Sequence, residues 1–295
     1  MGKPRRSMRV QSTKREAKEM KEDKVRKIVR EGYAKVAKKQ TSCCDNSASC
    51  GCSTVPTSEE LSSRIGYSAE ELNSVPEGAN LGLGCGNPTA MASLKEGETV
   101  LDLGSGAGFD VFLAANKVGK SGKVIGVDMT PEMLDKAREN ASKGKYGNVE
   151  FRLGEIENLP APDGSVDVVI SNCVVNLSPN KKKVFEEAFR VLKPNGRLMV
   201  SDIVLLKELP EIIRKNVQAY IGCVAGAEMK NKYLKIIEDA GFQKVKVIEE
   251  SVFPIDYVIS DPTAQKIIKD SKMPAEKIKE MATTIASIKV SAVKA

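Results

Sequence analysis

Residues 98–109 read ETVLDLGSGAGF, a short apolar run that ends in a turn with three glycines. The apolar run has the length and composition of a buried strand in a parallel sheet. Glycine lets the backbone approach a ligand closely and present its amide groups, so Gly104, Gly106 and Gly108 predict a binding turn ahead of the next helix. The stretch therefore favours an α/β fold that binds its ligand at the carboxyl ends of the strands.

The alternation of short apolar runs with longer amphipathic segments continues to residue 206. Four further strands are predicted at 123–130, 149–156, 166–173 and 197–204. Helices are predicted at 109–119, 131–144 and 181–196, the last ending at a Pro-Asn-Gly turn. Strands that alternate with helices in this way form a doubly wound, mostly parallel sheet.

The chain divides into five expected segments. They are a basic N-terminal arm ending in a helix (1–40), a Cys-rich loop (41–66), the α/β domain (67–206), a region with helices and a strand pair (207–262) and a helical C-terminal tail (263–295). We expect residues 1–30 and 262–295 to be loosely ordered or to pack peripherally.

The basic arm carries 15 Lys and Arg against 5 Asp and Glu in its first 40 residues. Such an arm can bind nucleic acid. However, Val25, Ile28, Val29, Tyr33 and Val36 recur at helical spacing, which favours an amphipathic helix that docks on the main domain. Aromatic residues are scarce and no nucleic-acid-binding module is recognisable, so we expect no nucleic-acid partner.

The bulk composition limits the chemistry. With 41% hydrophobic and 29% charged residues the chain is typical of soluble globular proteins. No apolar run approaches the roughly 20 residues of a membrane span, and no secretory signal is visible, so we expect a cytoplasmic protein. Seven cysteines in such a compartment favour reactive or metal-binding thiols over disulfides. The absence of histidine excludes Ser-His-Asp hydrolysis, His-ligated zinc and any His general base.

Acidic residues flank the glycine turn. Asp102 precedes it, and Asp128 closes the second strand twenty residues after Gly108, where a carboxylate can bind ribose hydroxyls. A dinucleotide would also suit this arrangement, but the turn lacks the final Gly/Ala spacing of the dinucleotide motif. Glu155 and Ile156 follow the third strand, where an adenine edge would lie.

The combination of VLDLGSGAGF (100–109), VIGVDMT (124–130), LGEIENLP (153–160) and VLKPNG (191–196) resembles the class I S-adenosylmethionine-dependent methyltransferases. The resemblance implies a Rossmann-like, seven-stranded sheet with a smaller substrate-binding subdomain, and makes 67–206 the cofactor-binding domain. It also implies that the methionine end of the cofactor is held by Asp102 and the turn, the ribose by Asp128, and the adenine by Glu155 and Ile156. The implied cofactor-binding residues are Asp102, Gly104, Ser105, Gly106, Gly108, Asp128, Met129, Glu155, Ile156 and Asn172.

Three isolated cysteines come from three different segments. Cys85 lies in GLGCGNP (82–88), Cys173 ends the fourth strand, and Cys223 lies in YIGCVAGA after the fifth. Each thiol can be simple packing, because cysteine is often buried. Convergent thiolates, however, suit a soft, thiophilic centre. Trivalent arsenic bound by three sulfurs keeps a lone pair that can attack a sulfonium methyl with no proton for a base to remove, so histidine is not needed.

The thiol segments, together with RIGYSAEELNSVPEGANLGLGCGNP (64–88), resemble the prokaryotic arsenite methyltransferases over about residues 33–250. The resemblance implies that Cys85, Cys173 and Cys223 bind the arsenic and that 207–262 belongs to the arsenic site. It implies a fourth cysteine from the N-terminal loop, with Cys52 preferred to Cys44 among Cys43, Cys44, Cys50 and Cys52. It also implies a disulfide that thioredoxin or glutathione reduces. One departure is Leu83, since many eukaryotic members place a tyrosine near the cofactor there.

Alternatives remain open at this point. The loop pattern CC-x5-C-x-C also suits a four-thiolate zinc site. The nucleobase-methyltransferase motif Asn/Asp-Pro-Pro-aromatic is absent after the fourth strand. The main hypothesis is methyl transfer from S-adenosylmethionine to thiol-bound arsenite by a monomer with no membrane partner. The alternatives are a methyltransferase for a small organic acceptor, such as a quinone precursor, and a thiol-based metalloid-binding protein with a vestigial cofactor domain.

Overall fold

The computed structural model describes residues 5–38, 57–214, 216–252 and 283–295. Its strands are β1 (Thr99–Leu103), β2 (Lys123–Asp128), β3 (Val149–Leu153), β4 (Val166–Asn172), β5 (Leu192–Leu205), β6 (Gln243–Val252) and β7 (Ile285–Val293). Its helices are α1 (Arg5–Lys38), α2 (Ser58–Arg64), α3 (Ala69–Asn73), α4 (Pro88–Met91), α5 (Phe109–Val118), α6 (Pro131–Lys143), the 3-10 turn η1 (Val175–Leu177), α7 (Lys181–Val191), α8 (Glu211–Arg214), α9 (Val217–Ile221) and α10 (Lys230–Asp239).

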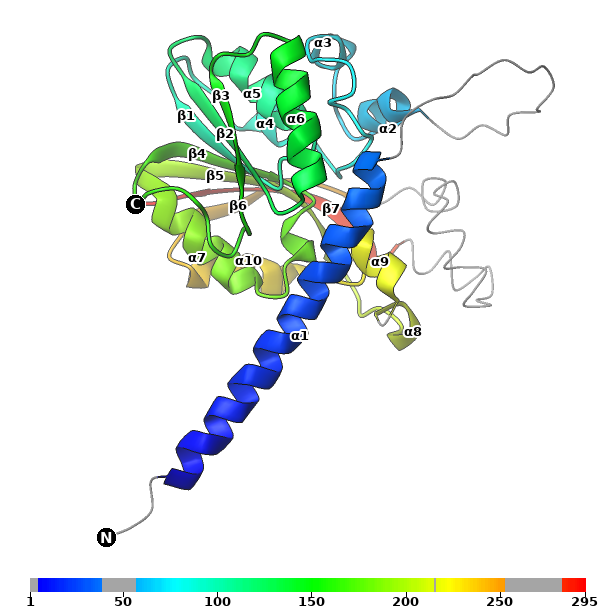
Figure 1. The fold of residues 1–295 in the computed structure, drawn as a ribbon, viewed down its shortest axis with the longest axis vertical. Helices are drawn as coiled ribbons and strands as arrows, with labels where there is room; N and C mark the ends of the chain where they lie inside the picture. The colour runs from blue at the N-terminus through cyan, green and yellow to red at the C-terminus, as the bar shows by residue number, and fades with distance from the viewer. Residues whose placement is uncertain (1–4, 39–56, 215, 253–282) are drawn as a thin grey trace, which may run out of the picture.

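In the described residues, one seven-stranded sheet runs in the order β3-β2-β1-β4-β5-β7-β6 (Figure 1). The pairs β1–β2, β1–β4, β2–β3 and β4–β5 are parallel, and β7 is antiparallel to both of its neighbours. The prediction of a doubly wound, mostly parallel, seven-stranded sheet is therefore confirmed. The order in which successive strands are added to the sheet reverses between β1 and β4. The carboxyl ends of these two strands therefore form the crevice where ligands bind in such sheets.

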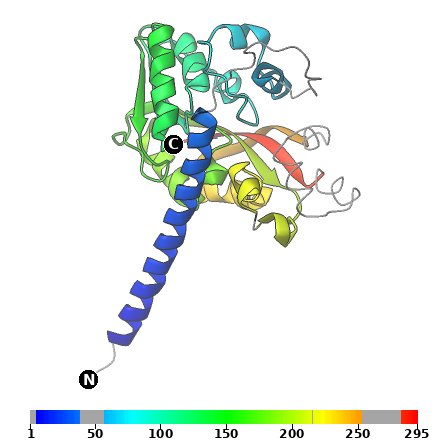
Figure 2. The same cartoon turned by 45° about the vertical axis from the view of Figure 1, so that its right-hand side comes forward.

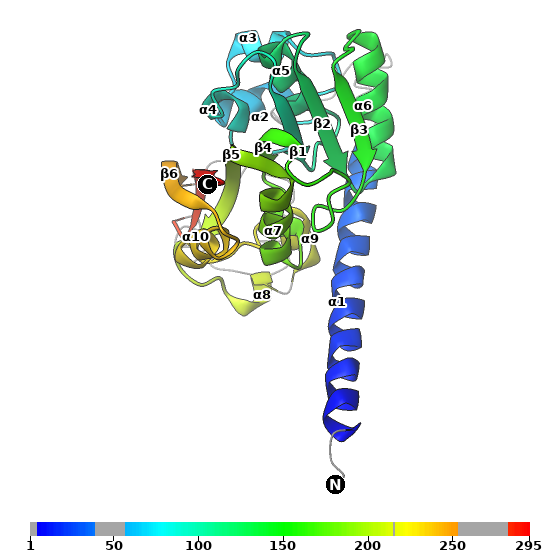
Figure 3. The ribbon, with the colours of Figure 1, turned by 90° about the vertical axis from the view of Figure 1, so that its left-hand side faces the viewer.

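Helices cover both faces of the sheet (Figure 3). On one face, α4 and α5 pack on a core that includes Val100, Val111 and Val168. On the other, α7 and α10 pack on a core that includes Leu101, Phe185 and Tyr233. The two cores alternate along β1 because successive strand side chains point to opposite faces.

The prediction of a helical C-terminal tail is wrong for residues 285–293, which form β7 between β5 and β6. A strand buried on both faces carries apolar residues at nearly every position, without the alternation that marks a half-exposed strand. Lys289 and Lys294 made the segment resemble an exposed helix in the sequence. Lys289 pairs with Glu249 on β6, and the Lys294 ammonium donates to the carbonyls of Phe189 and Leu192 at the end of α7.

Three other boundaries differ from the expectation. The helix predicted to end at residue 196 ends at Val191, since the proline at 194 disfavours helical backbone at the residue before it. Within the predicted loop 41–66, residues 58–64 form α2, which begins with a capping box between Thr57 and Glu60. The N-terminal helix is continuous from Arg5 to Lys38.

Helix α1 crosses the body of the protein between α6 and α9, and its N-terminal half projects away from it (Figure 2). Val29 is fully buried in the same apolar cluster as Cys85, Cys173 and Cys223. The expectation of a peripheral arm is thus wrong for residues 25–30, whereas the predicted amphipathic docking helix is present. Among the helices of the described ranges, none combines the length and apolar character needed to cross a bilayer.

Candidate functional site

The glycine turn between β1 and α5 has the shape the sequence predicted. Gly104, Gly106 and Gly108 all have positive φ angles, of 70°, 52° and 96°. A Cβ at Gly104 would lie 2.2 Å from Val174 Cγ2, whereas a Cβ at Gly106 would meet no atom within 4 Å. Gly104 is therefore required by packing, and Gly106 faces open space.

Asp128 holds this turn. Its carboxylate accepts hydrogen bonds from the backbone N–H of Gly106 (3.0 Å) and of Thr130 (2.8 Å). Burial raises the pKa of Asp128, and these bonds oppose that rise. The Asp102 carboxyl is also buried, and burial together with the charges of Asp110 and Asp128 raises its pKa well above the usual value. The turn thus presents a group of carboxyls that a positively charged ligand would stabilise.

A cavity of about 790 Å³ opens at the carboxyl ends of the strands. Its wall contains residues of the glycine turn, of the loop after β3, of the end of β4, of α9 and of α1. They include Asp102, Gly104, Ser105, Gly106, Asp128, Met129, Ile156, Asn172, Cys173, Cys223 and Tyr33. The predicted cofactor turn and two of the predicted thiols therefore share one cavity.

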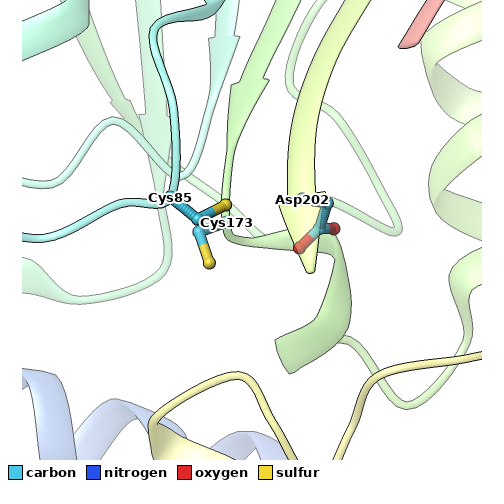
Figure 4. Close-up of side chains that lie close together, drawn as sticks. All are labelled: Cys85, Cys173 and Asp202. Atoms are coloured by element: carbon cyan, nitrogen blue, oxygen red, sulfur yellow. The ribbon is translucent and has the colours of Figure 1, made fainter. Parts of the chain in front are cut away.

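The three predicted cysteines lie together. The Sγ atoms of Cys85 and Cys173 and a carboxylate oxygen of Asp202 all lie within 4.8 Å of one another (Figure 4). The Cys223 thiol donates to the carbonyl of Cys173 over 2.8 Å. Of the three, Cys173 and Cys223 line the cavity, whereas Cys85 does not line it but has its thiol next to that of Cys173. The three are buried and free of disulfides.

The thiols affect one another. Hydrogen bonding with the Cys223 and Cys85 thiols, followed by burial, raises the pKa of Cys173 well above its usual value. Burial raises the pKa of Cys85, and its hydrogen bond with Cys173 opposes the rise. The thiols of Cys85 and Cys173 therefore keep their protons at physiological pH until a thiophilic atom replaces them.

Two of the cysteines have unusual backbone conformations. Cys173 and Cys223 have φ angles of 58° and 64°, a left-handed region that residues other than glycine seldom adopt. Backbone strain of this kind costs about 1–3 kcal/mol per residue and concentrates at functional sites. Both strained residues present a thiol to the cavity, so a packing role alone does not account for them.

The loop that carries Cys85 runs tightly against the ends of β4 and β5. A Cβ at Gly84 would lie 2.8 Å from the Asn172 amide, and one at Gly86 would lie 2.0 Å from Ser201 Oγ. The glycines on either side of Cys85 therefore allow the close approach that brings its thiol to the strand ends.

Asp202 lies in the middle of a buried polar network next to the thiols. It accepts hydrogen bonds from the Tyr233 hydroxyl (2.9 Å), the Asn176 amide (2.8 Å) and the backbone of Ile203 (2.9 Å). Burial raises the pKa of Asp202 to about 7. Figure 4 shows one of its oxygens turned toward the two cysteines. No pattern in the sequence marked this residue, which lies in the mostly apolar second half of β5.

The C-terminal half of α1 forms the roof of the cavity. The Tyr33 hydroxyl donates to the carbonyl of Ile221 on α9, and a Cβ at Gly32 would lie 2.9 Å from Ile221 Cδ1. The guanidinium of Arg26 lies 3.3 Å from Glu155 and 3.5 Å from Glu157. The amphipathic pattern predicted that this helix docks, but not that it covers a functional cavity.

The remaining predicted site residues lie in different surroundings. Gly108 is the residue before α5, and Ile156 and Met129 line the cavity. The Glu155 carboxylate faces Arg26 and Arg30 of α1. Asn172 lines the cavity, but its amide is bonded to protein groups. Cys44 and Cys52, like the proposed zinc pattern of the same loop, lie outside the described residues.

Comparisons with known proteins agree with this geometry. A family profile described as a methyltransferase domain matches residues 94–241. An arsenite methyltransferase of Halobacterium salinarum is 51% identical over 76% of this chain, and one of Aquipseudomonas alcaligenes is 41% identical over 58%. These matches span 59% and 51% of the relatives' own lengths, so the chain covers little more than half of each.

One solved structure is matched over a larger share of its own length. The crystal structure of an arsenic(III) S-adenosylmethionine methyltransferase from Chlamydomonas reinhardtii is 32% identical, with a TM-score of 0.58, over 80% of this chain and 73% of that one. The chain therefore belongs to the methyltransferase-domain family and, within it, to the family of the arsenite methyltransferases.

Proposed function

We propose that this protein transfers the methyl group of S-adenosylmethionine to trivalent arsenic bound by Cys85, Cys173 and Cys223, and so converts arsenite to methylated arsenicals. The observation that carries the proposal is the meeting of three thiols, 88 and 50 residues apart in the sequence, beside the glycine turn. Relatives that bear the arsenite methyltransferase name support it.

The residues around the turn fit S-adenosylmethionine. The buried hydroxyl of Ser105 has no hydrogen-bond partner among the described residues, and a Cβ at Gly106 would meet no atom within 4 Å. The carboxyls of Asp102 and Asp128 would attract the ammonium and bind the ribose hydroxyls, and Ile156 would pack on the adenine. The bound cofactor would supply an electrophilic methyl group. The chain's own part is to orient that group toward the thiols and to exclude water under α1.

Arsenic binding balances without a general base. Each As–S bond forms as one hydroxyl of arsenite leaves with a thiol proton as water, so three thiols release three waters. The lone pair of the thiol-bound arsenic would then be the acceptor for the methyl group that the bound cofactor supplies, and no side chain has to remove a proton. The methylated, pentavalent arsenic is reduced when a further thiol attacks one arsenic-bound sulfur: an S–S bond forms, that As–S bond breaks with its electron pair returning to arsenic, and the proton of the attacking thiol is released. We propose that Cys52 or Cys44 joins this step and that thioredoxin or glutathione then reduces the disulfide.

The direct test is an assay of the purified protein with arsenite, S-adenosylmethionine and a thiol reductant. We expect methylated arsenicals, with one S-adenosylhomocysteine formed for each methyl group transferred. The absence of any methylated arsenical, from protein that binds the cofactor by calorimetry, would reject the proposal.

The same assay separates the two alternatives. Serine at Cys173 or Cys223 should abolish methyl transfer and leave cofactor affinity within twofold. A methyltransferase for an organic acceptor, with cysteines that only pack, would keep its activity in both variants. A metalloid-sequestering protein would bind arsenite and fail to bind S-adenosylmethionine.

A further inference from the structure

The side-chain amide of Asn172 joins the loop of Cys85 to the strand of Cys173. Its oxygen accepts a hydrogen bond from the backbone N–H of Cys85 over 3.0 Å. Its nitrogen lies 2.8 Å from the carbonyl of Gly86, and also donates to Tyr67 and Asp110. Asn172 immediately precedes Cys173 in the chain. One amide therefore links the backbones of two thiol-bearing segments that are 87 residues apart.

The groups behind this amide are themselves held. The Tyr67 hydroxyl donates to Asp110 over 2.7 Å, and both groups are buried. Asp110 lies in the first turn of α5. The Asn172 amide is thus fixed in one orientation by acceptors from two other segments, because only its nitrogen can donate to the Asp110 carboxylate.

A second side chain holds Cys85 from the opposite side. The Ser287 hydroxyl of β7 donates to the carbonyl of Cys85 over 2.7 Å, and Ser287 is buried. The N–H and the C=O of Cys85 are therefore both bonded to side chains from sheet strands. Gly84 has a φ angle of 124°, and its Cα approaches Asn172 too closely for a Cβ. The backbone of this loop at Gly84 therefore packs directly against the Asn172 amide.

We propose that Asn172 is a positioning residue that fixes the distance between the Cys85 and Cys173 thiols, so that both bind the same thiophilic atom. This assignment differs from the cofactor contact implied by family resemblance, because the oxygen and nitrogen of the amide are already bonded to the protein. Two thiols held at a fixed separation bind one atom more tightly than two mobile thiols, since their ordering is not a cost of binding. The inference deepens the proposed function and rests on it only for the identity of the physiological ligand.

The test uses phenylarsine oxide, which bridges two thiols. Two As–S bonds form, and the oxygen leaves as water with both thiol protons. The parent is the full chain with serine at Cys223, Cys43, Cys44, Cys50 and Cys52, so that Cys85 and Cys173 are its only thiols. Its affinity is measured by competition with a small dithiol and by intact mass. A Cys85→Ser derivative defines binding to a single thiol.

We expect the parent to bind at least a hundredfold more tightly than the single-thiol derivative. In the parent, Asn172→Ala should weaken binding by about tenfold or more, as expected from the loss of a buried hydrogen bond of about 1.4 kcal/mol. Asn172→Asp keeps an acceptor for Cys85 but loses the donated bonds and places a charge beside Asp110, so it should weaken binding as well. Ser287→Ala should produce the same change from an independent position.

Asn148→Ala is the matched control. The Asn148 amide also donates to two backbone carbonyls, those of Ala115 and Gly119, but lies away from the thiols. Its loss should lower the melting temperature and leave arsenical affinity unchanged. The rate at which iodoacetamide alkylates a single thiol is a further readout, and we expect the Cys85 thiol to react faster in Asn172→Ala, as its loop opens.

Three results would overturn the inference: a parent that binds no better than the single-thiol derivative, unchanged affinity in Asn172→Ala and Ser287→Ala, or equal weakening by Asn148→Ala. These results are distinct from failure of the proposed function. Weakened bridging in the Asn172 variants with no methylation of arsenite by the native chain would leave the positioning role standing and remove the arsenite assignment.

Discussion

The two halves of the cavity are built in different ways. The half predicted to bind the cofactor comes from short, continuous segments, in which a strand, a glycine turn and a helix follow one another from Thr99 to Val118. The half that holds the thiols is assembled from the loop at Cys85, the end of β4, α9, β5 and the roof helix α1. The first half is a local structure, and the second exists only once the whole sheet has formed.

This difference predicts that a substitution can impair cofactor binding without impairing arsenical binding, and the reverse. Hydrogen bonds within the turn fix the cofactor half, so the loss of these bonds should weaken cofactor binding and leave arsenical binding unchanged. The thiol half depends on long-range contacts such as the bond between Cys85 and Asn172, so it should be the half more sensitive to distant changes. The variants below test that separation, from the largest expected effect to the smallest.

The largest effect is expected for Asp128→Ala. This change removes the acceptor for the Gly106 and Thr130 amides and the carboxylate that faces the cavity. Losing two hydrogen bonds to a charged group, at about 1.5–3 kcal/mol each, should weaken S-adenosylmethionine binding by a hundredfold or more. Calorimetry measures this loss. Phenylarsine oxide binding should be unchanged, and Cys173→Ser should give the reverse pattern. A variant that loses both ligands would contradict the separation.

The glycines of the turn should separate packing from binding. Gly104→Ala places a methyl group 2.2 Å from Val174, at a positive φ angle, and should lower the free energy of unfolding by about 3 kcal/mol. Gly106→Ala meets no atom, so it should cost only about 1 kcal/mol of backbone strain. It should nevertheless weaken cofactor binding at least tenfold.

Gly164→Ala is the control for Gly106→Ala. Gly164 has a φ angle of 57° and is also open, but it lies outside the cavity wall. Urea denaturation should give the two variants similar losses of stability, and only Gly106→Ala should lose cofactor affinity. Equal cofactor affinity in both would show that the space at Gly106 is not the binding space.

The same contrast explains what the sequence could predict. The parallel strands and the glycine turn were predictable because each depends on a local pattern, such as a buried apolar run or residues with positive φ. The meeting of the three cysteines was predictable only from resemblance to a family. Strand β7 was missed because a central strand lacks alternation and because Lys289 and Lys294 suggested an exposed surface. Their ammonium groups instead bond to Glu249 and to the end of α7.

The polar groups behind the thiols gave no signal at all. Asp202, Tyr67 and Ser287 each lie in segments whose local pattern is that of a strand or a loop. Their side-chain partners lie between 26 and 202 residues away, which no periodicity can indicate. Asn172 was predicted to lie at the site, but as a cofactor-binding residue. Its sequence neighbours do not indicate that its amide bonds to the loop of Cys85.

A smaller effect is expected from the titration of Asp110, which lies where the two halves meet. Burial raises the pKa of Asp110 to about 6, and the hydrogen bonds from Tyr67 and Asn172 oppose the rise. In the unfolded chain the pKa is about 3.9. The folded state therefore favours the neutral acid, so this contribution to stability is complete below about pH 4 and is lost as the pH rises through about 6.

The measurement compares the native chain with Asp110→Asn, which cannot ionise, by urea denaturation at a series of pH values. Between pH 4 and pH 7 the native chain should lose on the order of 1–2 kcal/mol relative to the variant. Asp163→Asn, which removes an exposed carboxylate paired with Arg190, is the control for the loss of a surface charge. A difference between native chain and Asp110→Asn that does not vary with pH would contradict the raised pKa.

The smallest effect concerns the roof helix, which connects the halves without belonging to either. Arg26 has a largely buried side chain beside Glu155 and Glu157. The pair with the partly exposed Glu155 contributes about 1 kcal/mol or less, and the buried Glu157 keeps its hydrogen bond from Ser178 when Arg26 is removed. Arg26→Ala should therefore lower the free energy of unfolding only modestly and raise the rate of cofactor release by a few fold, because α1 then opens more often. Stopped-flow displacement of the cofactor measures that rate.

Lys27→Ala removes an ion pair within the same helix, to Glu31, without touching the body of the protein. Since it leaves the contact between α1 and the loop after β3 intact, the release rate should stay at its native value. An equal acceleration in both variants would mean that the helix propensity of α1, and not its attachment at Glu155 and Glu157, governs access to the cavity.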